Sequence, residues 1–417
     1  MCGIFGAIAT ERKFEASAFE HFIQLTNLVH YRGPDDSGYI AINMESGPVR
    51  SPEAFDIFLG HRRLSILDLS PAGHQPMHDG NGRWIIFNGE IFNYLELRRE
   101  LQTMGHRFTT ECDTEVILHI YDKYGEDGFE KLNGMWAFAL VDIPRRRVVL
   151  SRDRFSIKPL YLTSVDDRIC FASEIKQLLS LVPSLQVNVE VMCAFLAQGL
   201  LDHSSETFFR GINQVPPKTN LVIDFGSREV RSKLYWDYTS APNCRPRETP
   251  DYFRELLIDS VRIRLRSDIR VGLLLSGGLD SSTLAIIARP LAEHNFETFS
   301  VVAEKQRYTE DKFITALTSA AGISNRKLVL RPFHIFEILE EAIYHHDEPF
   351  GHFSIIAHYK LLQLVKQQSD VVVLLSGQGG DETLLGYLKF FIFYIRDLVR
   401  QHKYSSAAQY QQDWATI

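Results

Sequence analysis

The chain has 417 residues, of which 45% are hydrophobic and 23% are charged, so it is long enough for two or three domains. Its formal net charge of −7 gives no electrostatic reason to expect nucleic acid or an anionic membrane as a partner. Five scattered cysteines without a C-x-x-C pair argue against a disulfide framework and a zinc ribbon. The sequence has neither a membrane-length apolar run nor a signal-peptide core, which predicts a cytoplasmic protein.

The first half of the chain is rich in short strand patterns between turn signals, with helical patterns placed among them. We expect strands at residues 3–9, 84–87, 135–141, 147–151 and 169–172, and helices at 19–29 and 114–124. This order predicts an α+β domain with two facing sheets over residues 2–205. A connecting region is expected at 206–249, because prolines gather there at positions 216, 217, 242 and 246.

The second half, residues 250–417, changes character. Helical spacing is found at 252–265, 282–292 and around 355–365, and continuous apolar runs are found at 271–275 and 371–375. Apolar strands that alternate with helices predict a parallel sheet covered on both faces. The aromatic run at 390–394 is too short to cross a membrane and predicts a buried helix turn.

Residue 2 is a cysteine, so removal of Met1 alone would make its thiol the first side chain of the protein. The freed α-amine would then lie within reach of the sulfur, and the reference pKa values of amine and thiol are about 8 and about 8.5. Such a pair is a candidate nucleophile with its own base. A cysteine at this position is more often accidental, and the rest of the chain decides between these readings.

The most specific motif follows the predicted strand at 271–275. Two glycines permit a tight turn, and hydroxyl residues open a helix whose N-terminus attracts anions. The candidate phosphate-binding residues are Ser276, Gly277, Gly278, Asp280, Ser281 and Ser282. Asp280 would repel phosphate unless a cation lay between them, which suggests a Mg²⁺ ligand. The motif resembles the pyrophosphate loop of the N-type ATP pyrophosphatases, and no Walker A lysine follows it.

A second loop of the same kind follows the strand at 371–375. It reads Ser376-Gly377-Gln378-Gly379-Gly380-Asp381-Glu382. Because the carboxyl ends of parallel strands share one edge of a sheet, both loops are expected to face one crevice. Asp381 then opposes Asp280 as a second metal-facing carboxylate. The alternative, a solvated acidic turn, is less favoured once the first loop is accepted.

Together the two halves resemble glutamine-hydrolysing asparagine synthetases over nearly the whole chain. The matching blocks in family order are residues 2–6, 31–35, 60–66, 87–91, 171–176, 276–282 and 376–382. The resemblance implies an N-terminal nucleophile (Ntn) hydrolase sandwich with αββα layers, acting as a class II glutamine amidotransferase, followed by an α/β parallel-sheet ATP-pyrophosphatase domain. It implies ATP and Mg²⁺ as cofactors, and glutamine, aspartate and ATP as substrates. A homodimer is compatible with it.

Residue by residue, the resemblance makes Cys2 the nucleophile on the side-chain amide of glutamine. It makes the Asn88 side chain and the Gly89 N–H the oxyanion donors, which must be aimed in advance of the reaction. Arg63 would fork onto the α-carboxylate of glutamine and Asp113 would pair with its α-ammonium. The remaining glutamine-binding positions are Leu64, Ser65, Ile66, Leu67 and Glu90.

In the second domain the resemblance implies that aspartate is adenylated and that ammonia then displaces AMP. It adds Leu274, Val301, Ser376 and Gly377 to the ATP site, and links Gln378 to acyl-adenylate formation. It also implies an apolar inter-domain channel for ammonia. Family members often carry Glu at the position of Gln378 and Gly at the position of Ser156. A Ser there costs roughly 1 kcal/mol or more if the backbone needs a positive φ.

Relatives continue past residue 417, so either this chain is a fragment or the second site is incomplete. We expect self-association of the isolated chain through the aromatic helix after Gly386. Three alternatives stay open: an acceptor other than aspartate, a glutaminase only, and a remnant without catalysis that binds glutamine or nucleotide. Cys2 argues against a β-lactam synthetase. The run 345–348, His-His-Asp-Glu, predicts a plain helix end rather than a metal site, with a lining role near the aspartate pocket as the alternative.

Overall fold

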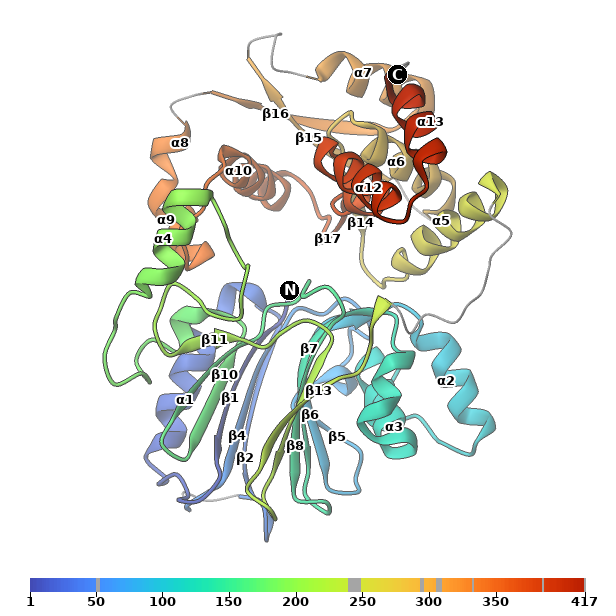
Figure 1. Ribbon diagram of the computed structural model, residues 1–417. Coiled ribbons are helices and arrows are strands. Elements are labelled where there is room, and N and C mark those ends of the chain that lie inside the picture. The colour runs from blue at the N-terminus through green and yellow to red at the C-terminus, as the bar shows by residue number, and fades with distance from the viewer. Residues whose placement is uncertain are drawn as a thin grey trace. The chain divides into compact units, whose positions relative to one another are not determined.

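The computed structural model describes residues 1–49, 53–238, 249–292, 296–304, 310–331, 334–384 and 386–415 (Figure 1). The chain divides into two compact units, and each is built from separate stretches of sequence. The first unit comprises Met1–Leu256, Arg266–Ile269 and Phe336–Ile356. The second comprises Leu257–Leu265, Arg270–Ile335 and Ala357–Ile417.

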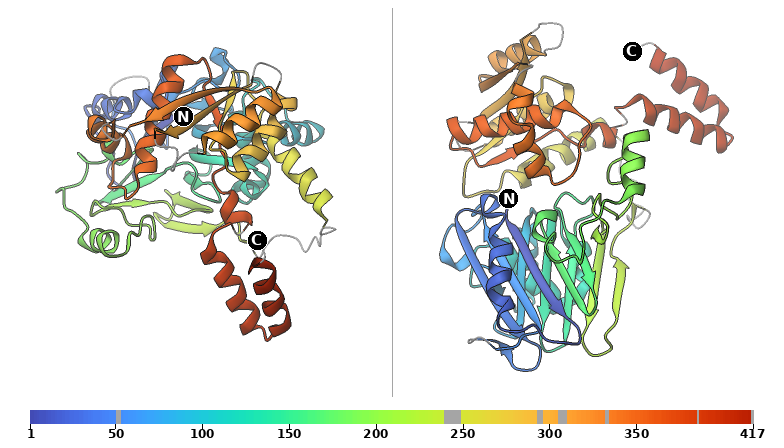
Figure 2. Two further views of the ribbon diagram at one scale, coloured as in Figure 1. Left: turned by 90° about the horizontal axis from the view of Figure 1, so that it is seen from above. Right: turned by 90° about the vertical axis from the view of Figure 1, so that its left-hand side faces the viewer.

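Two antiparallel sheets form the first unit (Figure 2). One has the order β11-β9-β10-β1-β4-β2-β3, with β1 (Gly3–Ala9), β2 (Asp36–Asn43), β3 (Gly47–Pro48), β4 (Ile57–Arg63), β9 (Tyr161–Val165), β10 (Arg168–Ala172) and β11 (Ile212–Gln214). The other has the order β13-β12-β8-β7-β6-β5, with β5 (Met77–His78), β6 (Arg83–Ile91), β7 (Gly134–Asp142), β8 (Arg147–Arg152), β12 (Thr219–Asp224) and β13 (Val230–Leu234).

The layers of this unit follow from the two faces of each sheet. Side chains alternate along β1, so Ile4 and Ile8 enter the core between the sheets while Phe5 enters a second core under α1 (Ala18–Asn27). A third core joins the outer face of the other sheet to α2 (Tyr94–Thr103) and α3 (Asp113–Tyr124), through Val116 and Ile120 among others. The order helix, sheet, sheet, helix confirms the predicted αββα sandwich.

The expected connecting region at 206–249 needs correction in its first part. Residues of β11 extend one sheet, and β12 and β13 extend the other, so the chain up to about residue 234 belongs to the sandwich. Local patterning missed β13 because it is exposed along its whole length, and missed β11 because it has only three residues. Pro242 and Pro246 lie outside the described residues.

A segment late in the sequence also packs into the first unit. It contains α9 (Leu339–His346), which confirms the predicted helix end at His346 and follows the short α8 (His334–Glu337). Asp347 caps α9 in the left-handed conformation, forms an ion pair of 2.9 Å with Lys176, and accepts a hydrogen bond from Ile175 N. Glu348 accepts another from Phe208 N. The two carboxylates therefore anchor this segment to the sandwich.

The second unit is built on a parallel sheet in the order β16-β15-β14-β17. Its strands are β14 (Val271–Leu274), β15 (Glu297–Ala303), β16 (Ser324–Leu330) and β17 (Val373–Leu375). One core joins the sheet to α5 (Pro250–Arg264), α6 (Leu279–Leu291) and α7 (Asp311–Ala321), and another joins it to α10 (Phe353–Gln368). Helices thus cover both faces, as the sequence predicts.

The end of the described chain forms α11 (Gly380–Leu384), α12 (Leu388–Arg400) and α13 (Tyr404–Ala415). The aromatic run at 390–394 is helical as expected, but the prediction that it is buried was wrong for most of it. Phe391 is buried against Tyr410 of α13, whereas Ile392, Phe393 and Tyr394 are exposed. None of the helices in the described part of the chain has the length and apolar character that a membrane crossing requires.

Replacement of Ser156 by Gly should stabilise the first unit. Ser156 has φ +56°, the left-handed conformation that costs a residue with a Cβ roughly 1–2 kcal/mol. Part of this gain is lost to the greater freedom of glycine in the unfolded chain, which leaves about 0.5–1 kcal/mol. Urea unfolding followed by tryptophan fluorescence measures the change, with Ser156→Ala as the control that keeps the strain. A Gly variant less stable than the Ala variant would contradict this account.

Replacement of Asp347 by Asn should loosen the segment 336–356. Asn also tolerates the left-handed conformation, so the substitution removes mainly the charge that faces buried Lys176. Breaking a buried ion pair in this way costs about 3 kcal/mol. Amide hydrogen exchange should show faster exchange in α9, and Glu11→Gln, which breaks the exposed pair with Arg228, should leave it unchanged. Equal exchange in both variants would refute the anchoring role.

Candidate active site

The thiol of Cys2 lies at the start of β1, against the backbone that follows β4. Its Sγ is 3.4 Å from Leu64 N and 3.7 Å from Leu64 O, and the Cys2 carbonyl accepts a hydrogen bond of 2.9 Å from Arg32 Nε. A Cβ on Gly3 would come within 2.7 Å of Val29 Cγ2, so this close approach favours glycine. The sulfur is thereby fixed next to the first residue of a buried strand.

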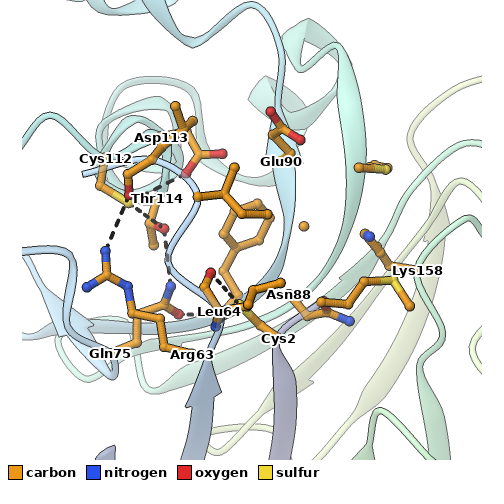
Figure 3. A pocket seen from close by; sticks show the side chains of 16 residues that line it. Cys2, Arg63, Leu64, Gln75, Asn88, Glu90, Cys112, Asp113, Thr114 and Lys158 are labelled. Atoms are coloured by element: carbon orange, nitrogen blue, oxygen red, sulfur yellow. Dashed lines mark hydrogen bonds between the residues drawn. The ribbon is translucent and has the colours of Figure 1, made fainter. Parts of the chain in front are cut away.

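A pocket opens beside this thiol (Figure 3). Its lining includes most of the predicted glutamine-site positions. The lining residues are Met1, Cys2, Arg63, Leu64, Ile66, Leu67, Gln75, Phe87, Asn88, Gly89, Glu90, Cys112, Asp113, Thr114, Met135 and Lys158. Ser65 is not among them, because its backbone N–H is turned to Asp35 Oδ2 at 2.7 Å.

The Asn88 side chain is fully buried, and within the described residues neither of its polar atoms has a hydrogen-bond partner. Leaving a buried amide unsatisfied costs about 1–3 kcal/mol, so native structures rarely tolerate it without a reason. Asn88 shares the pocket with Cys2, where a bound substrate would supply the missing partner. The amide is therefore free to donate to an oxygen that reaches the pocket.

One edge of β6 presents a row of backbone N–H groups beside the pocket. Phe87 N donates to Gln75 Oε1 at 2.7 Å, and Ile91 N donates to Asp113 Oδ2 at 2.8 Å. Alternate residues of a strand point their N–H groups to the same side, so Gly89 N–H lies between these two. The N–H groups on either side of it, those of Phe87 and Ile91, are thus already hydrogen-bonded to side chains.

The register with β7 supports this placement of the Gly89 N–H. Gly89 pairs with Trp136, whose backbone N–H and C=O are both bonded to Asp153 on the far side of β7. The pair is therefore a non-hydrogen-bonded one, and Gly89 directs its N–H away from β7. A Cβ at this position would lie 2.2 Å from Met135 O, which explains the glycine. Together, Asn88 and Gly89 offer two donors beside one thiol.

Arg63 differs from its expected role in what it contacts. Its side chain is buried, and its guanidinium donates to the carbonyl oxygens of Leu67, Asp68 and Ser70. These bonds hold the loop after β4, which carries Leu64, in place over the pocket. A contact with the α-carboxylate of glutamine stays a prediction. Arg63 would have to make this contact in addition to its hydrogen bonds with the three carbonyl oxygens.

Asp113 is the first residue of α3 and is buried at the pocket wall. Burial raises the pKa of its carboxyl to about 6, against the lowering effect of the hydrogen bond from Ile91 N. An unpaired buried carboxylate would favour a cationic partner such as an α-ammonium. Glu90 lines the same pocket and is also buried.

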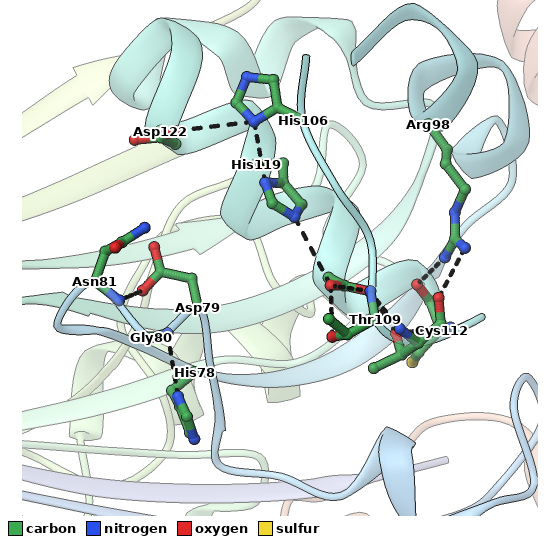
Figure 4. Close-up of polar contacts among 12 residues, drawn as sticks. His78, Asp79, Gly80, Asn81, Arg98, His106, Thr109, Cys112, His119 and Asp122 are labelled. Atoms are coloured by element: carbon green, nitrogen blue, oxygen red, sulfur yellow. Dashed lines mark hydrogen bonds and ion pairs between the residues drawn. The ribbon is translucent and has the colours of Figure 1, made fainter. Parts of the chain in front are cut away.

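The loop before α3 is tied down by polar contacts that fix the position of Asp113 (Figure 4). Arg98 donates to the carbonyl oxygens of Thr110 and Cys112, and Glu115 accepts from the backbone N–H groups of Thr109 and Thr110. Near them His106 Nδ1 and His119 Nδ1 lie 3.1 Å apart, so one donates and the other accepts. In the described part of the chain, no cluster of three or more potential ligands suited to a metal ion is found.

Two of the lining residues that sequence reasoning missed, Gln75 and Lys158, contribute polar groups to the pocket. Gln75 bridges Phe87 N and Thr114 Oγ1, and only its contacts in the fold reveal it. Lys158 is buried in the pocket although lysine is among the residues least often buried. It follows Ser156, whose positive φ is seen only in the structure.

In the second unit the first predicted loop joins β14 to α6. Gly277 has φ +89°, and Gly278 caps the helix. Ser276 Oγ accepts a hydrogen bond from Gly278 N at 3.2 Å and lies 2.9 Å from Ser281 Oγ. Ser281 is buried in the turn, whereas Ser276 is exposed. Ser282 N bonds to Gly278 O in the first helical turn.

The second loop lies beside the first, as the sequence predicts. β14 and β17 pair in parallel with Leu273 opposite Leu375, so both strands end at one edge of the sheet. A Cβ on Gly377 would lie 3.1 Å from Ser281 N, and one on Gly380 would lie 2.3 Å from Asp280 Oδ2. Glycine at these positions lets the carboxylate of Asp280 reach the second loop.

The acidic residues of the two loops gather around one phenol. Glu382, Asp381 and Asp280 each raise the pKa of Tyr387, Glu382 the most. Mg²⁺ is usually held by one or two carboxylates, with phosphate oxygens and water completing its shell. Asp280 and Asp381 have the donor chemistry for this role, and a Mg²⁺ ion here would neutralise phosphate charge.

The other predicted nucleotide positions occupy the strands and the tip of the second loop. Leu274 and Val301 pack at the core formed by Phe299 and α10. Ser376 Oγ accepts from Gln378 N at 3.2 Å, and the Gln378 side chain is exposed. Gly377 contacts the first loop as described above.

Two family models match the chain. Residues 1–236 match the glutamine amidotransferase domain, and residues 252–415 match asparagine synthase. Among solved structures, a glutamine phosphoribosylpyrophosphate amidotransferase from Bacillus subtilis matches at a TM-score of 0.41 and 17% identity, covering 78% of this chain and 81% of that one.

Curated relatives extend over nearly the whole chain. A provisionally named asparagine synthetase [glutamine-hydrolyzing] 2 of Methanocaldococcus jannaschii is 32% identical over 96% of this chain and 78% of its own. Asparagine synthetase [glutamine-hydrolyzing] 1 of Bacillus subtilis is 32% identical over 93% of this chain, which spans 59% of that relative. Amidase chyE of Penicillium rubens is 30% identical over 87% of this chain and 54% of its own.

The thiol beside two hydrogen-bond donors, the paired Ser-Gly loops and the similarity to these curated relatives agree with one another. An identity of 32% over most of both chains is enough to decide membership. The chain belongs to the family of glutamine-hydrolysing asparagine synthetases.

Proposed function

We propose that this protein hydrolyses glutamine at Cys2 and uses the ammonia to convert ATP-activated aspartate into asparagine. The observation that carries the proposal is the buried Asn88 amide, which has no hydrogen-bond partner among the described residues and shares a pocket with the Cys2 thiol and the Gly89 N–H. The chain spans 52–63% of the length of three Bacillus relatives, so the activity of a complete protein is part of the proposal.

In the glutaminase reaction, Cys2 Sγ attacks the carboxamide carbon of glutamine. The α-amine of Cys2, once Met1 is removed, accepts the thiol proton and passes it to the leaving nitrogen, which departs as ammonia. Asn88 and Gly89 donate to the oxyanion of the tetrahedral intermediate. Water then attacks the thioester, which releases glutamate and restores the thiol.

In the synthetase reaction, the β-carboxylate of aspartate attacks the α-phosphorus of ATP and displaces pyrophosphate. The loop from Ser276 to Ser282 supplies hydroxyls and a helix N-terminus for the phosphate oxygens. Ammonia attacks the acyl carbon, AMP leaves, and the nitrogen loses a proton to give the amide. Asp280 and Asp381 would hold the Mg²⁺ that neutralises phosphate charge.

A different carboxylate acceptor is the second candidate. Two observations favour this second candidate. The chain is similar to a relative named amidase chyE, and the second loop carries the neutral residue Gln378. Product analysis with aspartate and other carboxylic acids decides between the two.

Two variants separate the half-reactions. Cys2→Ala should abolish glutamine hydrolysis but keep ammonia-dependent amide formation, whereas Asp280→Asn should keep glutaminase activity and lose amide formation.

A third variant tests the oxyanion donors. Asn88→Ala, which removes one oxyanion donor, should lower the glutaminase kcat by about 10²–10³. Ammonia release and asparagine are measured together by mass spectrometry. Glutamine hydrolysis without any amide product in the wild type would leave a glutaminase only, and full activity in Cys2→Ala would refute the proposal.

Glutaminase activity should fall on the acid side with an apparent pKa of about 6. Asp113 must be ionised to bind the α-ammonium of glutamine, and burial raises the pKa of its carboxyl to about 6 in the free protein. Because kcat/KM reports the free enzyme, its profile should show this limb. Asp113→Asn should raise KM and remove the limb. An unchanged profile in this variant would exclude Asp113 as the titrating group.

A further inference from the structure

Lys158 is a buried cation in the pocket of Cys2 that the proposed reaction does not yet use. Its side chain lines the same pocket as Cys2 and Asn88 and is 5% exposed (Figure 3). Within the described residues no hydrogen bond or ion pair of its ammonium group is found. Lysine is rarely buried unless it is paired, so this placement calls for a partner within the pocket.

The loop that carries Lys158 is built to hold it there. The carboxylate of Asp153 accepts hydrogen bonds from the backbone N–H groups of Trp136, Phe155, Ile157 and Lys158. Arg152 Nε donates to the Lys158 carbonyl at 2.9 Å. Ser156 adopts a strained φ of +56° between them. A solvent-exposed lysine would need none of this support.

The charges around Lys158 identify what it acts on. Burial, and to a smaller extent Arg32, lower the pKa of its ammonium group to about 8, while Cys2, Glu90 and Asp153 oppose the shift. Lys158 is thus electrostatically coupled to the thiol of Cys2.

We propose that Lys158 is a positioning residue of the glutaminase site, whose positive charge favours the thiolate of Cys2. This inference rests on the proposed function, because it assigns the charge that activates the same nucleophile. The thiol proton still goes to the α-amine, and Lys158 keeps its own proton throughout. A cation in the same pocket stabilises the negative charge of the sulfur.

The direct test is the pH dependence of Cys2 alkylation by iodoacetamide, followed on the N-terminal peptide by mass spectrometry. That peptide also reports whether Met1 has been removed and separates Cys2 from exposed Cys193. Lys158→Met, which keeps the apolar stem and loses the charge, should move the midpoint up by about one pH unit, a tenfold slower reaction at neutral pH. Lys158→Arg should restore it, and Lys131→Met, which removes a cation outside the pocket, should change nothing.

Steady-state kinetics then distinguish this role from others. Lys158→Met should lower the glutaminase kcat about tenfold with KM unchanged, whereas a raised KM alone would mean that Lys158 binds substrate and would overturn the proposal. An alkylation midpoint equal to that of the wild type, in a variant with an unchanged melting curve, would also overturn it. Lys158→Gln serves as the second charge-free variant if the Met variant does not fold. A shifted midpoint in a protein without glutaminase activity would support Lys158 and refute the proposed function.

Discussion

The Arg32 guanidinium joins the carbonyl oxygen of Cys2 to the buried carboxylate of Glu174, with both contacts at 2.9 Å. This interaction fixes the position of the Cys2 backbone, which immediately precedes β1. Glu174 in turn accepts a hydrogen bond from Tyr31 and pairs with Lys176. Two segments distant in sequence, residues 31–32 and 174–176, therefore fix one backbone atom next to the candidate nucleophile.

The same network reaches the segment 336–356. Lys176 pairs with Asp347 as well as with Glu174, and all three side chains are largely buried. Burial alone would raise the pKa of Glu174, but the cations Arg32 and Lys176 keep it below its ordinary value. A carboxylate held ionised in this way strengthens each charge-assisted bond around it. The order of the candidate active site thus depends in part on residues that follow the first Ser-Gly loop in sequence.

Sequence reasoning predicts those parts of the fold that local pattern determines. The bounds of β1 are the predicted ones, because its apolar residues alternate between two cores. The two Ser-Gly loops lie side by side because parallel strands end at a common edge. The actual contacts of Arg63 were not predictable, since they depend on how the loop after β4 folds back. Lys158 was missed because nothing in its local sequence distinguishes a buried lysine from a surface one.

The two predicted sites use the same backbone chemistry in different settings. In the sandwich, the Gly89 N–H lies at the edge of β6, between the N–H groups of Phe87 and Ile91, which donate to side chains. In the parallel sheet, N–H groups converge where β14 ends and α6 begins. Both arrangements place fixed donors before any negative charge develops, which is what stabilises an oxyanion or a phosphate without reorganisation. This requirement explains why glycine occupies three positions in these sites. A side chain at Gly89 or Gly380 would collide with a neighbour, and Gly277 has a positive φ.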